Sequence, residues 1–77
     1  MTVIGYRKTG FDTKDGKHID GYNIYCAYPL DKGEGDGAER LFMTVDRLLD
    51  CGYNPTVGDT IVVRYNKYGK PESIESV

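Results

Sequence analysis

The sequence predicts a small all-β domain with one short helix, and three observations support this fold class. The chain has 77 residues, the length of one domain with a small core. Segments near both ends are rich in β-branched and aromatic residues, which favour strands. Asp15-Gly16 and the pair Asn66 and Gly69 have the residue types of tight turns between such strands. We therefore treat residues 1–77 as a single domain.

The first two strands are expected in "VIGYRKTGF" and "GYNIYCAY". In the second segment Tyr22, Ile24 and Cys26 alternate with residues of the opposite face, the period of two that is typical of a half-buried strand. Asp15-Gly16 lies between the two segments, so we expect a long antiparallel hairpin with its tip at residues 13–17. Pro29 ends the second strand.

A third strand is expected in "ERLFMTV", with Leu41, Met43 and Val45 on one face and Phe42 on the other. It follows a glycine-rich acidic segment, "DKGEGDGAE" at residues 31–39. Alternating glycines and carboxylates loosely suggest calcium, but the spacing of a calcium-binding loop is absent. We interpret the segment as a flexible, solvated loop, or as a weak mimic of nucleic acid that competes for a basic face.

A short helix is expected in "VDRLLDC". Thr44 or Asp46 would cap its N-terminus, Leu48 and Leu49 would face the core, and Gly52 would supply the left-handed C-terminal residue.

The C-terminal part predicts a second hairpin, with strands in "TIVVRY" and "KPESIESV" and a tight turn at "NKYG". Pro71 lies near the start of the last strand, where an edge strand tolerates a missing N–H. The predicted order is strand, strand, strand, helix, strand, strand. This is the order of the five-stranded, partly open OB barrel. In that fold the loop between strands one and two and the loop between strands four and five flank a binding face. An SH3-like barrel is the alternative, since "VGDTIVV" before a glycine turn also suits it.

The composition excludes several classes of function. No apolar run approaches the roughly 20 residues of a membrane helix, and the N-terminus has no signal-peptide pattern, so we expect a cytoplasmic protein without a membrane partner. Cys26 and Cys51, the only cysteines, are interpreted as reduced structural thiols. With the single His18 they do not make a metal site, and no cofactor is expected. We find no nucleophile or phosphate-loop pattern either, so an enzyme is the least favoured class.

Charge is unevenly distributed. The net charge is −2, but the acidic segment carries Asp31, Glu34, Asp36 and Glu39 against Lys32, and without it the chain has nine basic and eight acidic residues (10 − 1 and 12 − 4). Both predicted hairpin tips that would flank an OB binding face are basic, and the sequence has seven tyrosines. Exposed aromatic rings beside cations can stack on unpaired bases while the cations neutralise phosphates.

These features predict binding of single-stranded nucleic acid, DNA or RNA, without catalysis. The candidate site residues are basic and aromatic, and they come from both hairpins: Arg7, Lys14, Lys17, Tyr25, Arg64, Lys67, Tyr68 and Lys70. Two alternatives stay open. In the first, the tyrosines are structural residues that cover a small barrel. In the second, the tyrosine-rich face meets a protein partner, as Tyr and Arg often do at interfaces.

The segments "GFDTKDGKHIDGYNIYCAY" and "VGDTIVVRYNKYGKPESIESV" resemble the first and last hairpins of the small OB-fold single-stranded-DNA-binding proteins of bacteriophages and conjugative elements. The resemblance covers most of the chain but skips the acidic segment. It implies coating of transient single strands in a mobile element, usually as a homodimer, with Tyr25 and Tyr68 stacking on bases and the basic candidates contacting phosphates. The helix-like "VDRLLDCG" and the acidic net charge depart from that family.

Overall fold

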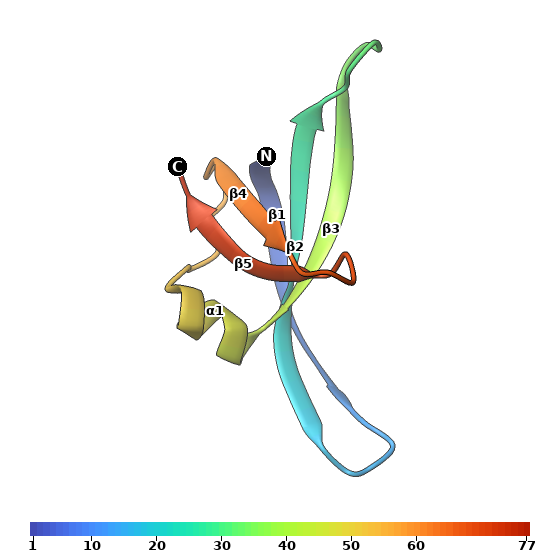
Figure 1. Ribbon diagram of the computed structural model, residues 1–77, viewed down its shortest axis with the longest axis vertical. Helices are drawn as coiled ribbons and strands as arrows, with labels where there is room; N and C mark the ends of the chain where they lie inside the picture. The colour runs from blue at the N-terminus through green and yellow to red at the C-terminus, as the bar shows by residue number, and fades with distance from the viewer.

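The computed structural model describes residues 1–77 as five strands and one helix (Figure 1). The elements are β1 (Thr2–Asp12), β2 (His18–Pro29), β3 (Asp36–Thr44), α1 (Val45–Cys51), β4 (Ile61–Tyr65) and β5 (Pro71–Ser76). The predicted order of elements and the prediction of a small, mostly β domain are therefore confirmed. The structure contains no helix that is long and apolar enough to cross a membrane.

Strands β1, β2 and β3 form one antiparallel sheet in that order. β1 and β2 pair from Thr2 opposite Ala27 to Asp12 opposite His18, with an irregularity between Val3 and Gly5. The turn at residues 13–17 is closed by the Thr13 N–H, which donates to the Lys17 carbonyl at 2.7 Å. The long first hairpin and its tip are therefore placed as predicted.

Strands β4 and β5 form a separate two-stranded antiparallel sheet. The turn between them is tight, because the Asn66 N–H donates to the Lys70 carbonyl at 2.8 Å and Gly69 has a φ of 75°. A left-handed φ favours glycine, so the second hairpin turn is also confirmed.

The five strands do not close into a barrel. The two sheets are joined by one isolated bridge, Thr2 with Thr60, and by neighbouring backbone hydrogen bonds such as Val3 N–H to the Asp59 carbonyl at 2.8 Å. β3 is the last strand of its sheet and forms no ladder with β5. A closed barrel would need β3 to pair with β5, and this pairing is absent. The predicted all-β domain is therefore confirmed as two packed antiparallel sheets, whereas the predicted barrel is not.

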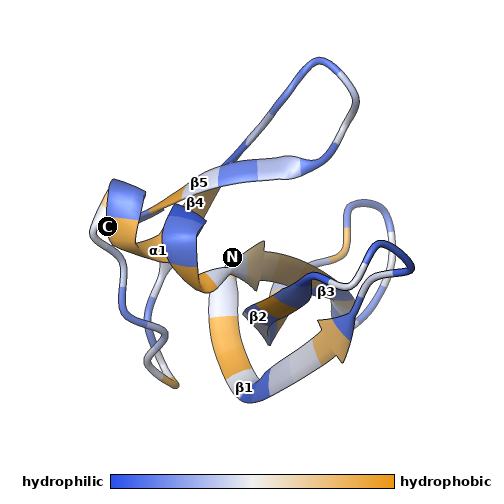
Figure 2. Cartoon of the chain, turned by 90° about the horizontal axis from the view of Figure 1, so that it is seen from below, coloured by the Kyte–Doolittle hydropathy of each residue, from blue (hydrophilic) through white to orange (hydrophobic).

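The core lies between the two sheets and α1. It consists of side chains from one face of the three-stranded sheet and from the elements that cover this face: Val3, Ile24, Cys26, Leu41, Met43, Leu48, Tyr53, Ile61 and Ile74. Figure 2 shows the hairpin tips as mostly hydrophilic and the hydrophobic segments in β1, β4 and α1. The molecule measures 45 × 25 × 24 Å, because the β1–β2 hairpin extends beyond this core at one end and the β2–β3 hairpin extends beyond it at the other.

The helix α1 has the caps that its sequence predicts. Thr44 accepts a hydrogen bond from the Arg47 N–H at 3.2 Å, and Gly52 has a φ of 72°. Leu48 is buried, but the side chain of Leu49 is 74% exposed, so the prediction that both leucines face the core is wrong for Leu49. Neighbouring helical residues point about 100° apart, and only one face of this two-turn helix touches the sheet.

Candidate nucleic-acid interface

The three-stranded sheet has one face in the core and one face turned away from it. Residues directly opposite each other in neighbouring strands share a face, and successive residues alternate. Tyr25 pairs with Arg40, whereas its neighbours Ile24 and Cys26 are fully buried. By the same pairing rule, the residues on Tyr25's side of the sheet form what we call the outer face, which includes Arg7, Phe11, Ile19, Gly21, Asn23, Tyr25, Asp36, Ala38, Arg40 and Phe42.

Tyr25 occupies an open position on the outer face. Gly5 lies opposite it on β1, and no atom lies within 4 Å of the place where a side chain of Gly5 would begin. Arg40 lies opposite it on β3, and Arg7 is its diagonal neighbour on β1. Tyr25 is 36% exposed, meets no side chain from Gly5, and has a cation on each flanking strand. This arrangement suits a base stacked on the ring with its phosphates at the arginines.

A second aromatic group crosses the outer face towards the β1–β2 tip. The Phe42 ring on β3 lies across Gly21 of β2, where an added Cβ would come within 2.6 Å of the ring. It reaches Phe11 on β1, with ring centroids 5.8 Å apart and an interplanar angle of 49°. Glycine at position 21 thus allows one aromatic pair to span the three strands. Phe11 is 48% exposed, so part of this pair is open to solvent.

The cations of the outer face have no carboxylate partner. The ion pairs in the structure are those of His18 with Asp12 and with Asp20, and of Arg64 with Glu75. Arg7 and Arg40 are exposed and take part in none of them. Their charges are available to an anionic ligand.

A groove runs beside the outer edge of β3, between this strand and the β4–β5 tip. Its volume is about 490 Å³, and we call it the β3 groove after its lining: Glu39, Arg40, Leu41, Phe42, Thr44, Arg47, Tyr65, Gly69, Lys70 and Pro71. Arg47 is held there by donating to the Pro71 carbonyl at 2.8 Å. The Tyr65 hydroxyl donates to Glu39 at 3.3 Å. Burial and then the nearby Glu39 carboxylate raise the pKa of Tyr65.

The β4–β5 tip presents an aromatic ring to solvent. Tyr68 is 76% exposed, and the Lys67 ammonium lies 5.2 Å from the centre of its ring. The Asn66 side chain orders the turn by accepting from the backbone N–H groups of Tyr68 at 2.9 Å and Lys70 at 3.0 Å. Figure 1 shows this tip beside the lower half of β3.

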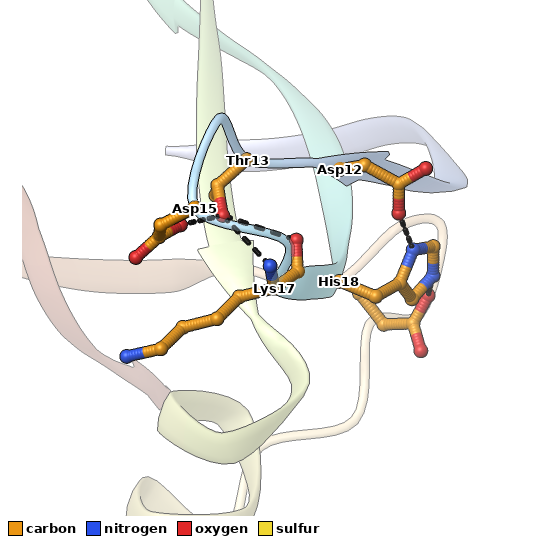
Figure 3. A network of polar contacts seen from close by, with 6 residues as sticks. Asp12, Thr13, Asp15, Lys17 and His18 are labelled. Atoms are coloured by element: carbon orange, nitrogen blue, oxygen red, sulfur yellow. Dashed lines mark hydrogen bonds and ion pairs between the residues drawn. The ribbon is translucent and has the colours of Figure 1, made fainter.

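The β1–β2 tip is less basic than its lysines suggest. Lys14 and Lys17 are exposed, but Thr13 donates to the carboxylate of Asp15 at the same turn. His18 lies between two further carboxylates, with Nδ1 2.8 Å from Asp12 (Figure 3) and Nε2 2.9 Å from Asp20. Hydrogen bonds to Asp12 and then Asp20 raise the pKa of His18. The charges at this tip therefore nearly balance.

The structure brings together only some of the predicted site residues. Arg7 and Tyr25 are neighbours on the outer face, and Lys70 lines the β3 groove next to the tip that carries Lys67 and Tyr68. Lys14 and Lys17 lie at the far end of the β1–β2 hairpin, apart from this group (Figure 1).

Arg64 does not belong to the group. It is paired with Glu75 at 3.7 Å across the β4–β5 sheet. Its neighbour Val63 pairs with the buried Ile74 and packs against the core, and consecutive strand residues point to opposite faces, so Arg64 points away from the core.

Sequence reasoning missed four residues of this surface: Phe11, Arg40, Phe42 and Arg47. A signal was present for Phe42, because its alternation with Leu41 and Met43 already placed it on the opposite face. Arg47 had no such signal, since its position depends on how α1 packs against β5.

None of the protein-family models, curated proteins or solved structures compared with this chain matches it. No group of three or more His, Cys, Asp or Glu side chains has a geometry that could hold a metal ion.

Proposed function

We propose that the chain binds single-stranded nucleic acid on the outer face of its three-stranded sheet, without a catalytic step. The observation that carries the proposal is the position of Tyr25, a partly exposed ring with unpaired Arg7 and Arg40 on the flanking strands. Stacking on a ring needs bases that are not already paired, so a single strand fits better than a duplex. The Phe11–Phe42 pair offers a second stacking position on the same face.

The proposal includes an OB-like arrangement that is open between β3 and β5. What supports it is the spatial order of the strands, β3-β2-β1 continued through the Thr2–Thr60 bridge to β4 and β5, with α1 between β3 and β4. In OB folds the face of the second and third strands binds oligonucleotides, and the outer face here belongs to the same strands. The resemblance to phage and conjugative-element proteins supports a role in coating transient single strands.

The test is fluorescence anisotropy of a labelled mixed-sequence single-stranded DNA oligomer, titrated with the protein at about 50 and about 200 mM salt. A single strand loses about 0.7 log unit of affinity per log unit of salt for each neutralised phosphate, so three phosphates predict a roughly twentyfold weaker complex at the higher salt. Two or three stacked rings predict micromolar affinity in one protomer.

Tyr25→Leu and Tyr28→Leu form a matched pair for this titration. The two tyrosines lie on the same strand and are 36% and 37% exposed, but they belong to opposite faces of the sheet. Loss of a stacking ring costs about 1–3 kcal/mol, so Tyr25→Leu should weaken binding roughly 5- to 150-fold while Tyr28→Leu leaves it near wild type. Equal effects of the two changes, or no binding at either salt, contradict the proposal and favour a protein partner for this face.

A further inference from the structure

The outer edge of β3 is a free strand edge with a self-complementary pattern of charge. β3 is the last strand of its sheet, so its outer backbone groups have no ladder partner. The β3 groove and the β4–β5 tip lie along residues 39–44, whereas residues 36–38 do not line the groove. In Figure 1 the upper half of β3 has no neighbouring element on its outer side. Free edges of this kind are templates for pairing with another strand.

The side chains on this edge select the partner. Asp36 and Arg40 both lie on the outer face, are both exposed, and form no ion pair within the chain. Ala38 lies midway between them and has a small side chain. In an antiparallel pair of two β3 strands centred on Ala38, Arg40 of each copy lies opposite Asp36 of the other. Opposite charges directly across a pair of strands stabilise it, and the two-fold axis provides this contact twice.

The same register gives the acidic segment a binding site. β3 begins at Asp36, so the β2–β3 turn of each copy, which carries Asp31 and Glu34, lies just beyond the Asp36–Arg40 pair, towards Phe42 of the second copy. The loop that carries Asp31 and Glu34 then reaches the β3 groove of the second copy, whose lining holds three cations against one carboxylate: Arg40, Arg47 and Lys70 against Glu39.

We propose that the outer edge of β3 binds a second copy of the chain, antiparallel and centred on Ala38, with each acidic loop at the other copy's β3 groove. The pairing joins two three-stranded sheets into one sheet of six strands. Both outer faces then lie on the same side of that sheet, because the axis is perpendicular to it. Asp36 of each copy then lies beside Arg40 of the other, and the acidic loops occupy the grooves in trans, so both compete with any anionic ligand that binds there. This interaction does not depend on nucleic-acid binding.

The test is sedimentation velocity over a concentration series, without nucleic acid. Wild type should show a reversible dimer that weakens as salt is raised. Arg40→Glu places like charges opposite each other twice and should raise the dimer Kd on the order of tenfold. Arg7→Glu is the matched control, because Arg7 lies on the same face but on β1, away from the edge.

The double change Asp36→Arg with Arg40→Asp restores opposite charges across the axis and should bring the dimer back. All four residue changes involve exposed side chains, and circular dichroism checks that each variant stays folded. A wild type that stays monomeric at every concentration overturns the proposal. A dimer that Arg40→Glu and Arg7→Glu weaken equally, or that the double change fails to restore, overturns it as well.

Discussion

His18 shows how one residue ties the two strands of the projecting hairpin together. Its two ring nitrogens meet carboxylates from both sides of the turn, Asp12 on β1 and Asp20 on β2. Gly10 makes room for this arrangement, because an added Cβ would lie 2.8 Å from Asp20 and 3.1 Å from the imidazole. Both nitrogens can donate to carboxylates only when the ring is protonated.

The folded pKa of His18 should lie above the ordinary value of 6.5, because hydrogen bonds to Asp12 and then Asp20 favour the cation. The stabilisation is then fully present below the unfolded pKa and is lost as pH rises through the folded pKa. Since the chain has one histidine, its ring proton resonance can be followed by NMR without assignment. Asp12→Asn should lower the pKa, and a wild-type pKa at or below 6.5 contradicts the arrangement.

The two cysteines should differ in reactivity. Cys26 is fully buried in the core, and burial raises the pKa of its thiol, so little thiolate forms. Cys51 is only partly buried, at the end of α1. In a thiol-exchange assay on the native protein, one thiol should react quickly and the other only on unfolding. Cys51→Ser should remove the fast phase, and a fast phase that persists in this variant contradicts the assignment.

At the scale of the elements, two glycines of the sheet differ in the space around them. Gly21 lies beneath the Phe42 ring, and an added Cβ would also lie 2.7 Å from the backbone oxygen of Met43. At Gly5 an added Cβ meets nothing within 4 Å. Neither residue has a left-handed φ, so the comparison isolates the effect of space.

Gly21→Ala should therefore destabilise the fold by about 1–3 kcal/mol, as overpacking typically does. Gly5→Ala should stay within about 1 kcal/mol of wild type, because it mainly restricts the unfolded chain. Urea unfolding of both variants measures the difference. Equal stabilities would mean that the Phe42 ring does not cross the sheet at Gly21.

At the scale of the whole molecule, the β1–β2 hairpin divides into a core part and a projecting part. Ile24 is fully buried between the sheets, whereas Ile19 on the same strand pairs with the exposed Phe11 near the tip. The amide of Ile19 should thus exchange its hydrogen through local opening, faster than that of Ile24, which needs global unfolding. Native-state hydrogen exchange tests this, and equal protection of the two amides would show that the hairpin opens as one unit.

Sequence patterns predicted the local features of the molecule better than its long-range ones. The alternation in β2, the Asp15-Gly16 turn, and the Thr44 and Gly52 caps depend on neighbouring residues, and each lies where it was expected. Barrel closure depends on whether β3 and β5 pair, which no short pattern encodes. The core role of Tyr53, whose hydroxyl donates to Asp59 at 3.2 Å, likewise arises from tertiary packing.

In the candidate site, too, local features were predicted better than long-range ones. Period-two alternation correctly placed Tyr25 outside the core, and the turn composition correctly exposed Tyr68. The basic tips were judged by composition alone, so the carboxylates around His18 and the pairing of Arg64 with Glu75 were not foreseen. Those partners come from across a turn or a strand, where register decides which charges meet.

The most direct test of the proposed interface is an amide NMR titration of the labelled protein with a short single-stranded DNA oligomer. Binding on the outer face predicts saturable shifts at positions on all three strands, centred on Arg7, Tyr25 and Arg40, with smaller ones along the β3 groove. The outer surface of β4 and β5 around Arg64 should stay unchanged. Shifts confined to the β1–β2 tip, or no saturable shifts at millimolar oligomer, would contradict the account.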